Sequence, residues 1–227
     1  MNNRQEHLLS IIVKEHLETG LPVGSGVLVD KYGLDISPAT VRNEMAELES
    51  QGYIAQPHTS AGRVPTEAAF LWLVNNLEVG KVDQIEKQVK EALEQSLKQG
   101  LKPAAKTLAE LSGLAVFWAF HRHNVYYTGV CNLLQQPEFA NRGVIYDLSA
   151  IIDRVDEIVN EIFDKVTEEP QIMIGEDSPF GSFSGTVICK YKTEETGIFG
   201  IIGPLRMDYA KNFALVDYLK ELLKNSN

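Results

Sequence analysis

The sequence predicts an α+β protein that opens with a winged helix-turn-helix and continues through a helical linker into an α/β sandwich. Three short helical stretches come first, and a turn-rich hairpin pattern follows them directly. A charged helical stretch comes next, and after it apolar strand-like runs alternate with amphipathic helices. These three observations predict a first domain over 1–78, a linker helix over 79–105 and a second domain over 106–227.

The first two helices are predicted by apolar spacing and glycine stops. Residues 5–19 place an apolar stripe on one side, and Gly20 ends that helix. Ser25 can begin a second, shorter helix that ends near Gly33. The stripe of the first helix consists of Leu9, Ile12, Val13 and Leu17.

The third helix has the clearest start signal in the chain. Ser37 can act as the N-cap, and Pro38 stands at the first helical position, where its missing N–H has no partner to lose. Gly52 is a residue typical of a helix end. The predicted buried stripe between them consists of Val41, Met45 and Leu48.

A short hairpin is predicted directly after this helix. Residues 53–55 and 63–64 favour strands, and the small polar run 57–62 between them favours a turn. Thr66 can cap a fourth helix over 67–77. A helix-turn-helix followed by a β-wing is typical of modules that read double-stranded DNA.

Candidate DNA contacts follow from which residues face outward. In the first two turns of the third helix, short hydrogen-bonding side chains suit base edges, an alanine suits a thymine methyl, and Arg42 suits phosphate better than guanine. Asn43 has the alternative role of a solvated residue with local capping. In the hairpin we expect contacts to the DNA backbone or the minor groove, with Arg63 as the best cation. The candidates are Ser37, Ala39, Thr40, Arg42, Asn43, His58, Thr59, Ser60 and Arg63.

Bulk charge opposes DNA binding. The formal net charge is −10, and the first 80 residues hold five Lys and Arg against ten Asp and Glu. Affinity must therefore come from a few placed cations, from a helix N-terminus and from a dimer that doubles the contacts.

The stretch 81–100 carries apolar residues close to heptad spacing. One interpretation is a linker helix packed on its own domain, and the other is a dimer seam. Beyond it, strands are predicted over 114–120, 125–130, 171–174, 186–191 and 198–202, with helices over 148–166 and 209–223. We expect these helices to cover one face of the sheet.

Several classes of function are disfavoured. The N-terminus shows no secretory signal and no apolar run is long enough to cross a bilayer, so a cytoplasmic protein without membrane contact is expected. Cys131 and Cys189 lack paired spacing and fit reduced thiols. His121 and His123 have no further ligands at readable spacing, so no metal and no cofactor is expected. No catalytic motif is present, so we predict that the protein is not an enzyme.

Three ordered segments resemble the HrcA family of bacterial heat-inducible transcription repressors. The first joins the Arg42–Met45 run to the Pro57–Arg63 hairpin, and the others are residues 132–139 and 202–210. The resemblance implies a GAF-like second domain and a homodimer that represses chaperone genes from an inverted-repeat operator. It also implies modulation by the chaperonin GroEL.

This chain departs from the family pattern in two places. With 227 residues it is short, and the shortfall falls between Leu114 and Val130, where the family carries an inserted dimerising subdomain. Ala69–Leu71 also lacks an arginine that the family has there.

Two questions stay open at this stage. The segment 203–209 is a turn into a helix with Asp208 as a possible N-cap, and either a structural role, with Arg206 paired to an acid, or a regulatory role fits it. A small-ligand-sensing regulator acting through the GAF-like domain is the alternative function.

Overall fold

A computed structural model describes residues 1–58, 61–76, 85–137 and 142–225. The expected α+β class is confirmed: helices predominate, and the strands form two antiparallel sheets. Contacts divide the chain into two compact units, Met1–Asn76 and Leu77–Asn227. Each unit is described by itself.

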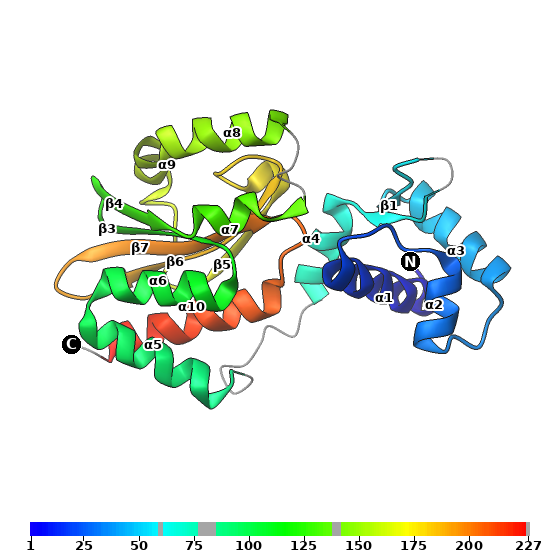
Figure 1. The fold of residues 1–227 in the computed structure, drawn as a ribbon, viewed down its shortest axis with the longest axis horizontal. Helices are drawn as coiled ribbons and strands as arrows, with labels where there is room; N and C mark the ends of the chain where they lie inside the picture. The colour runs from blue at the N-terminus through cyan, green and yellow to red at the C-terminus, as the bar shows by residue number, and fades with distance from the viewer. Residues whose placement is uncertain (59–60, 77–84, 138–141, 226–227) are drawn as a thin grey trace. The chain divides into compact units, whose positions relative to one another are not determined.

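The first unit contains the helices and the hairpin that the sequence predicted (Figure 1). Ile54 pairs with Pro65 and Ala55 with Val64, so the two strands are antiparallel. The elements are α1 (Asn3–Thr19), α2 (Ser25–Tyr32), α3 (Pro38–Ser50), β1 (Ile54–Ala55), β2 (Val64–Pro65) and α4 (Glu67–Asn76).

Thr66 directly precedes α4, and its carbonyl oxygen accepts from the Phe70 N–H at 3.3 Å, as expected of an N-cap residue. Its hydroxyl donates to the carbonyl oxygens of Gly52 at 2.6 Å and Tyr53 at 3.0 Å. Thr66 therefore ties the start of α4 to the point where the chain leaves α3.

In the second unit, the expected linker helix is two helices, α5 (Lys87–Gln99) and α6 (Leu101–Ser112). Gly100, with φ +127°, adopts a conformation at the break that side chains disfavour. Leu93 of α5 is fully buried, and the Tyr218 hydroxyl donates to Glu94 at 2.6 Å. The apolar face of α5 thus packs inside its own unit.

The second unit is built on a five-stranded antiparallel sheet in the order β4-β3-β7-β6-β5. Its strands are β3 (Ala115–His121), β4 (Asn124–Thr128), β5 (Gln171–Ile174), β6 (Ser184–Lys192) and β7 (Thr196–Pro204). The remaining elements are α7 (Val130–Leu134), α8 (Arg142–Asp153), α9 (Val155–Ile162), the 3₁₀ turn η3 (Gly175–Asp177) and α10 (Tyr209–Lys224). The helix predicted over 148–166 is thus broken at Arg154 into α8 and α9.

Helices cover both faces of this sheet, so the expectation of one covered face is wrong. Figure 1 shows α8 and α9 on one side and α6 and α10 on the other. The reason lies in the strands, where consecutive residues such as Phe117 and Trp118 are both fully buried. Side chains on a strand alternate between faces, so burial of both requires cover on both sides.

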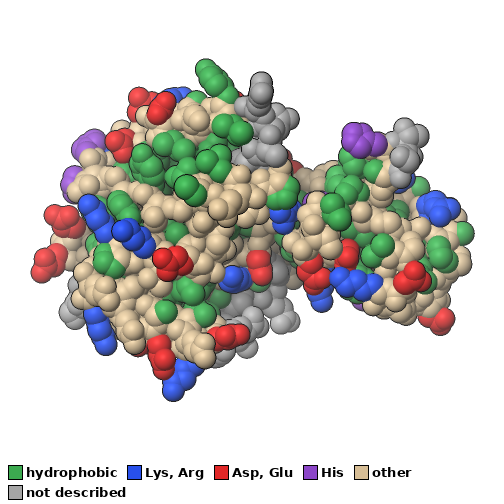
Figure 2. All heavy atoms as spheres, in the orientation of Figure 1, with side chains coloured by type: hydrophobic (Ala, Val, Ile, Leu, Met, Phe, Trp, Pro, Cys, Tyr) green, Lys and Arg blue, Asp and Glu red, His purple; other side chains and the backbone are tan. Residues whose placement is uncertain are grey.

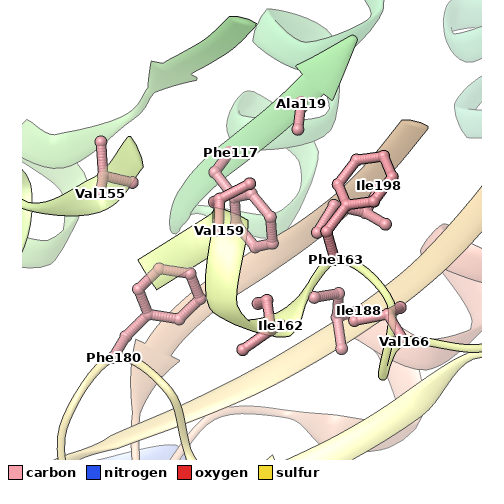
Figure 3. Packing of buried hydrophobic residues seen from close by; sticks show 10 residues of the cluster. All are labelled: Phe117, Ala119, Val155, Val159, Ile162, Phe163, Val166, Phe180, Ile188 and Ile198. Atoms are coloured by element: carbon pink, nitrogen blue, oxygen red, sulfur yellow. The ribbon is translucent and has the colours of Figure 1, made fainter. Parts of the chain in front are cut away.

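The two faces of the sheet pack against their helices through different kinds of side chain. On one, Phe117 and Ile188 of the sheet pack against Val159 of α9 (Figure 3). On the other, the Trp118 ring stacks on Phe199 with centroids 4.6 Å apart, and its indole N–H donates to the Tyr191 hydroxyl at 3.0 Å.

The segment 114–130, where the sequence placed the shortfall, contains the β3–β4 hairpin. Arg122, at its turn, forms an ion pair with Asp164 at 2.5 Å and lies 5.2 Å from the centre of the Phe163 ring. The guanidinium lowers the pKa of the Asp164 carboxyl by hydrogen bonding. The tip of the hairpin is therefore fastened to the chain just after α9.

The two motifs outside the first unit meet in space. Arg206 donates to the Gln136 side chain at 3.2 Å, so an amide is one of its partners. Asn132 donates to the Leu114 carbonyl oxygen at 3.1 Å. Asp208 caps α10 as predicted, accepting from the Lys211 backbone N–H at 3.0 Å.

Substitution of Gly185 by alanine tests the packing of α10 on the sheet. An added Cβ would overlap the hydroxyl of buried Tyr209, which donates to the Leu205 carbonyl oxygen at 2.8 Å. We expect Gly185→Ala to lower the free energy of unfolding of the second unit by about 1–3 kcal/mol. Urea unfolding followed by Trp118 fluorescence in a Trp72→Phe background measures it.

The matched control is Gly26→Ala in α2, where an added Cβ meets nothing within 4 Å. That variant should leave the second unit unchanged. Equal unfolding curves for Gly185→Ala and its parent would contradict the packing.

Candidate nucleic-acid interface

The N-terminus of α3 is capped by the side chain of Ser37. Ser37 is extended, and its hydroxyl accepts from the Thr40 backbone N–H at 3.1 Å and contacts the Thr40 hydroxyl at 2.9 Å. Pro38 occupies the first turn, as predicted. The first turn of a helix has unpaired N–H groups and a partial positive charge, both of which favour phosphate.

The two faces of α3 divide as the spacing predicted. Its buried residues include the expected apolar stripe. Thr40 is half-buried, and the exposed residues of the first turns include Ala39, Arg42, Asn43 and Ala46. Among the residues that the structure describes, neither Arg42 nor Asn43 has a side-chain partner, so both are available to a ligand.

Two carboxylates of α3, one buried and one exposed, fasten the helix to α1. Glu44 is only 7% exposed and forms an ion pair with Arg4, while Glu47 accepts from the Gln5 amide at 2.7 Å. One Glu44 oxygen has no hydrogen-bond partner in the described part of the chain. A buried carboxylate is costly unless it is paired, so the position of Arg4 is tightly constrained.

The second arm of the hairpin rests on the chain between α1 and α2. The Val23 N–H donates to the Arg63 carbonyl oxygen at 2.7 Å, and the Arg63 N–H donates back at 2.9 Å. A Cβ at Gly62 would overlap the Val23 carbonyl. Only glycine allows this close approach.

Arg63 is held by an acid of α3 and is not a free cation. Its Nε and Nη2 both lie 2.9 Å from Oε2 of Glu49, and its side chain is 16% exposed. The other Glu49 oxygen accepts from the Gln56 backbone N–H at 3.0 Å. Glu49 therefore joins α3 to both arms of the hairpin, a role that sequence reasoning missed.

The tip of the hairpin is only partly described. His58 is exposed, and its carbonyl oxygen accepts from the Ala61 N–H at 2.9 Å, which closes a turn. Thr59 and Ser60 lie outside the described residues. The candidates that the structure brings together are thus Ser37 to Asn43 at one end of α3.

Most of the few cations in the first unit are already paired. Lys31 bridges Glu15 at 2.6 Å and Glu18 at 3.0 Å, which links α2 to α1. Hydrogen bonds from Lys31 and then Tyr32 lower the pKa of Glu15. With Arg4 and Arg63 also paired, Arg42 and Lys14 are the cations of this unit to which the described residues offer no acid.

Other kinds of site find little support in the described residues. Within them, no group of three or more His, Cys, Asp or Glu is arranged to hold a metal ion. His121 and His123 are exposed at the β3–β4 turn. No described helix has the length and apolar character needed to cross a membrane.

Comparisons with known proteins indicate a single family. A sequence model described as the HrcA protein C-terminal domain matches residues 65–212. The heat-inducible transcription repressor HrcA of Mycobacteroides abscessus is 54% identical over 77 residues, which cover 34% of this chain and only 23% of that protein.

Two further similarities cover the whole chain. The repressor of the same name from Carboxydothermus hydrogenoformans is 26% identical over 340 aligned positions, covering 100% of this chain and 99% of that protein. Since this chain has 227 residues, the remaining positions are gaps in it. A crystal structure titled as a hypothetical protein has a TM-score of 0.73 with 18% identity, covering 100% of both chains, and that likeness shows the fold alone.

The Arg63–Glu49 pair gives a direct test of the hairpin anchor. We expect Arg63→Ala to destabilise the first unit by about 1–3 kcal/mol, because it leaves a half-buried carboxylate unpaired. Glu49→Gln should cost less, since its amide still accepts from Gln56. In the double variant the two losses should not add, and urea unfolding completes this thermodynamic cycle. Strictly additive losses would mean that the contact contributes nothing.

Proposed function

Because the chain belongs to the HrcA family of heat-inducible transcription repressors, we propose that it represses transcription by binding an inverted-repeat operator as a homodimer. The first unit would be a winged helix-turn-helix and the second a GAF-like sandwich. The observation that carries the proposal is the N-terminal end of α3, which is exposed and bears a cation and a neighbouring amide that the described residues leave unpaired.

In this proposal α3 enters the major groove with its N-terminal turns foremost. A helix of 13 residues is about 20 Å long, and the groove is about 12 Å wide, so the first turns reach base edges. Asn43 would pair with a base edge, Ala39 would meet a thymine methyl, and Arg42 would clamp a phosphate. Ser37 and Thr40 would bind a phosphate together with the helix N-terminus.

The hairpin would contact the DNA backbone through its tip, with His58, Thr59 and Ser60 as the proposed contacts. In this proposal Arg63 is no longer a cation that contacts DNA directly. Its pairing with Glu49 makes it a positioning residue that fixes the angle between hairpin and helix. Its effect on binding would then be equal for all DNA sequences.

The genes controlled and the partner protein come from the family resemblance. Chaperone genes would be the targets, and GroEL would modulate the active fold in the cytoplasm. Regulation by a small ligand is the alternative. The apolar hollow between α8 and the sheet holds only about 30 Å³ and is too small for such a ligand. Two open hollows on the opposite side of the unit are larger, at about 520 Å³ beside Leu97 and about 470 Å³ beside Val89, and they are where a ligand would be sought.

Paired substitutions on α3 separate base reading from phosphate contact. Asn43→Ala should cost about 1–3 kcal/mol on the cognate duplex and little on a scrambled one, because only the cognate offers the matching edge. Arg42→Ala should weaken binding to both. Gel shifts at fixed salt measure this, and equal losses from Asn43→Ala on the two duplexes would exclude base reading.

The scarcity of free cations predicts a shallow dependence on salt. Each neutralised phosphate contributes a slope of about −0.9 to the log–log plot of affinity against salt. We expect a slope no steeper than about −8 for the dimer, and weak binding to nonspecific DNA. Fluorescence anisotropy across salt concentrations gives the slope, and a steeper one would mean that many more cations reach the DNA.

A further inference from the structure

The exposed large hydrophobic side chains of the second unit are confined to one stretch of its described residues. They are Tyr127 of β4, Leu134 of α7, and Ile145 and Tyr146 of α8. Their exposed fractions are 45%, 46%, 39% and 76%. Scattered apolar residues need no explanation, but a concentration of them indicates an interaction surface.

One of these side chains lines an apolar hollow, and the other three lie within three residues of positions that line it. Tyr127 lines it together with Leu133, the neighbour of Leu134, and with Leu148 and Ile151 of α8. Figure 2 shows hydrophobic side chains gathered between α7 and α8 on this face of the unit. We call the four exposed side chains and strand β4 together the β4–α8 surface.

The β4–α8 surface includes one edge of the described sheet. β4 is the outermost strand, with β3 as its only neighbour in the described sheet. Its residues, Asn124 to Thr128, include Val125 and two tyrosines and carry no charge and no proline. Natural proteins usually protect such an edge with lysine, proline or a bulge, because it is a template for another strand. The register shift between β3 and β4 lies next to the hairpin turn, between Ala119 and His121, so the pairing from Val116 to Ala119 is regular.

The exposed area suits a dimer of ordinary size. At roughly 200 Å² for each large side chain, the four exposed fractions amount to about 400 Å². A standard interface buries about 800 Å² from each partner, of which about 60% is apolar. The four side chains thus supply most of the apolar area that one half of a dimer needs.

We propose that the β4–α8 surface binds the same surface of a second copy, with the two β4 strands antiparallel across a two-fold axis. An uncharged strand meets no like charge when it pairs with itself, and a two-fold contact satisfies both edges at once. A nucleic acid would require several cations, and β4 itself carries none. The other apolar candidate for self-association, the face of α5, is used within the unit.

This inference rests on the proposed function only in naming the surface through which the repressor dimerises. Self-association needs no DNA and can be measured separately. Sedimentation velocity of the full chain from about 0.1 to 100 μM covers the range of affinities usual for transient dimers.

We expect the unmodified chain to form a dimer, and Tyr146→Lys to raise the dimer dissociation constant at least tenfold. Tyr127→Lys should act in the same direction, and its folding is checked by thermal unfolding because the side chain lines the hollow. Tyr146 is mostly exposed, so Tyr146→Lys should fold. It therefore tests the proposed interface even if Tyr127→Lys fails to fold. The matched control is Leu21→Lys, which changes a side chain 65% exposed in the first unit and should leave the dimer intact.

Amide hydrogen exchange supplies the second readout. Exchange at β4 should slow as the concentration of the unmodified chain rises, and it should not slow for Tyr146→Lys. A chain that stays monomeric throughout, or variants that associate like the unmodified chain, would overturn the inference.

Failure of the proposed function would look different. In that case the chain would dimerise through this surface and still bind neither the operator nor a single half-site. If the surface alone is wrong, the Tyr146→Lys variant would bind the full operator as tightly as the unmodified chain.

Discussion

The account depends on how the acidic side of α3 is held against its own domain. Glu44 is paired with Arg4 and Glu49 with Arg63, so the carboxylates nearest the core are neutralised at the points where α1 and the hairpin meet α3. These pairs reduce the negative charge around α3, which the proposed contact with DNA requires, and they fix the helix against α1 and the hairpin. An acidic domain can bind a polyanion only if its negative charges are paired or lie away from the binding surface.

The architecture of the second unit follows from the need to cover apolar side chains. Its strands are apolar on both sides, so each face needs helical cover, and α8 covers its side incompletely. The outcome is an apolar hollow, an exposed helix face and an open strand edge at one border of the sheet. A single contact between two copies would cover all three, and it would also give the two-fold symmetry that an inverted repeat requires.

Local signals in the sequence predicted the local structure well. The serine–proline start at Ser37 and the glycine at the end of α1 gave the helix bounds, because capping depends on neighbouring residues only. The exposed and buried faces of α3 followed from spacing. The unbroken apolar run of β3 indicates that both of its faces are buried. The expectation that helices cover only one face of the sheet did not use this signal and was wrong.

Contacts between distant residues could not be predicted in the same way. Nothing in the spacing of Glu49 and Arg63 indicates that they meet, and so Arg63 was expected to be a free cation. Likewise, the pairing of Arg206 with Gln136 joins residues 70 positions apart. Such contacts depend on the tertiary fold, which capping and periodicity do not specify.

The central claim is that the N-terminal end of α3 enters DNA. Its most direct test is to map amide chemical shifts of the full chain as the operator duplex is added. The account predicts the largest changes at Ser37 to Asn43 and around His58, with small changes over the exposed face of α1. Saturable binding that leaves the α3 amides unchanged and shifts only other parts of the chain would contradict it.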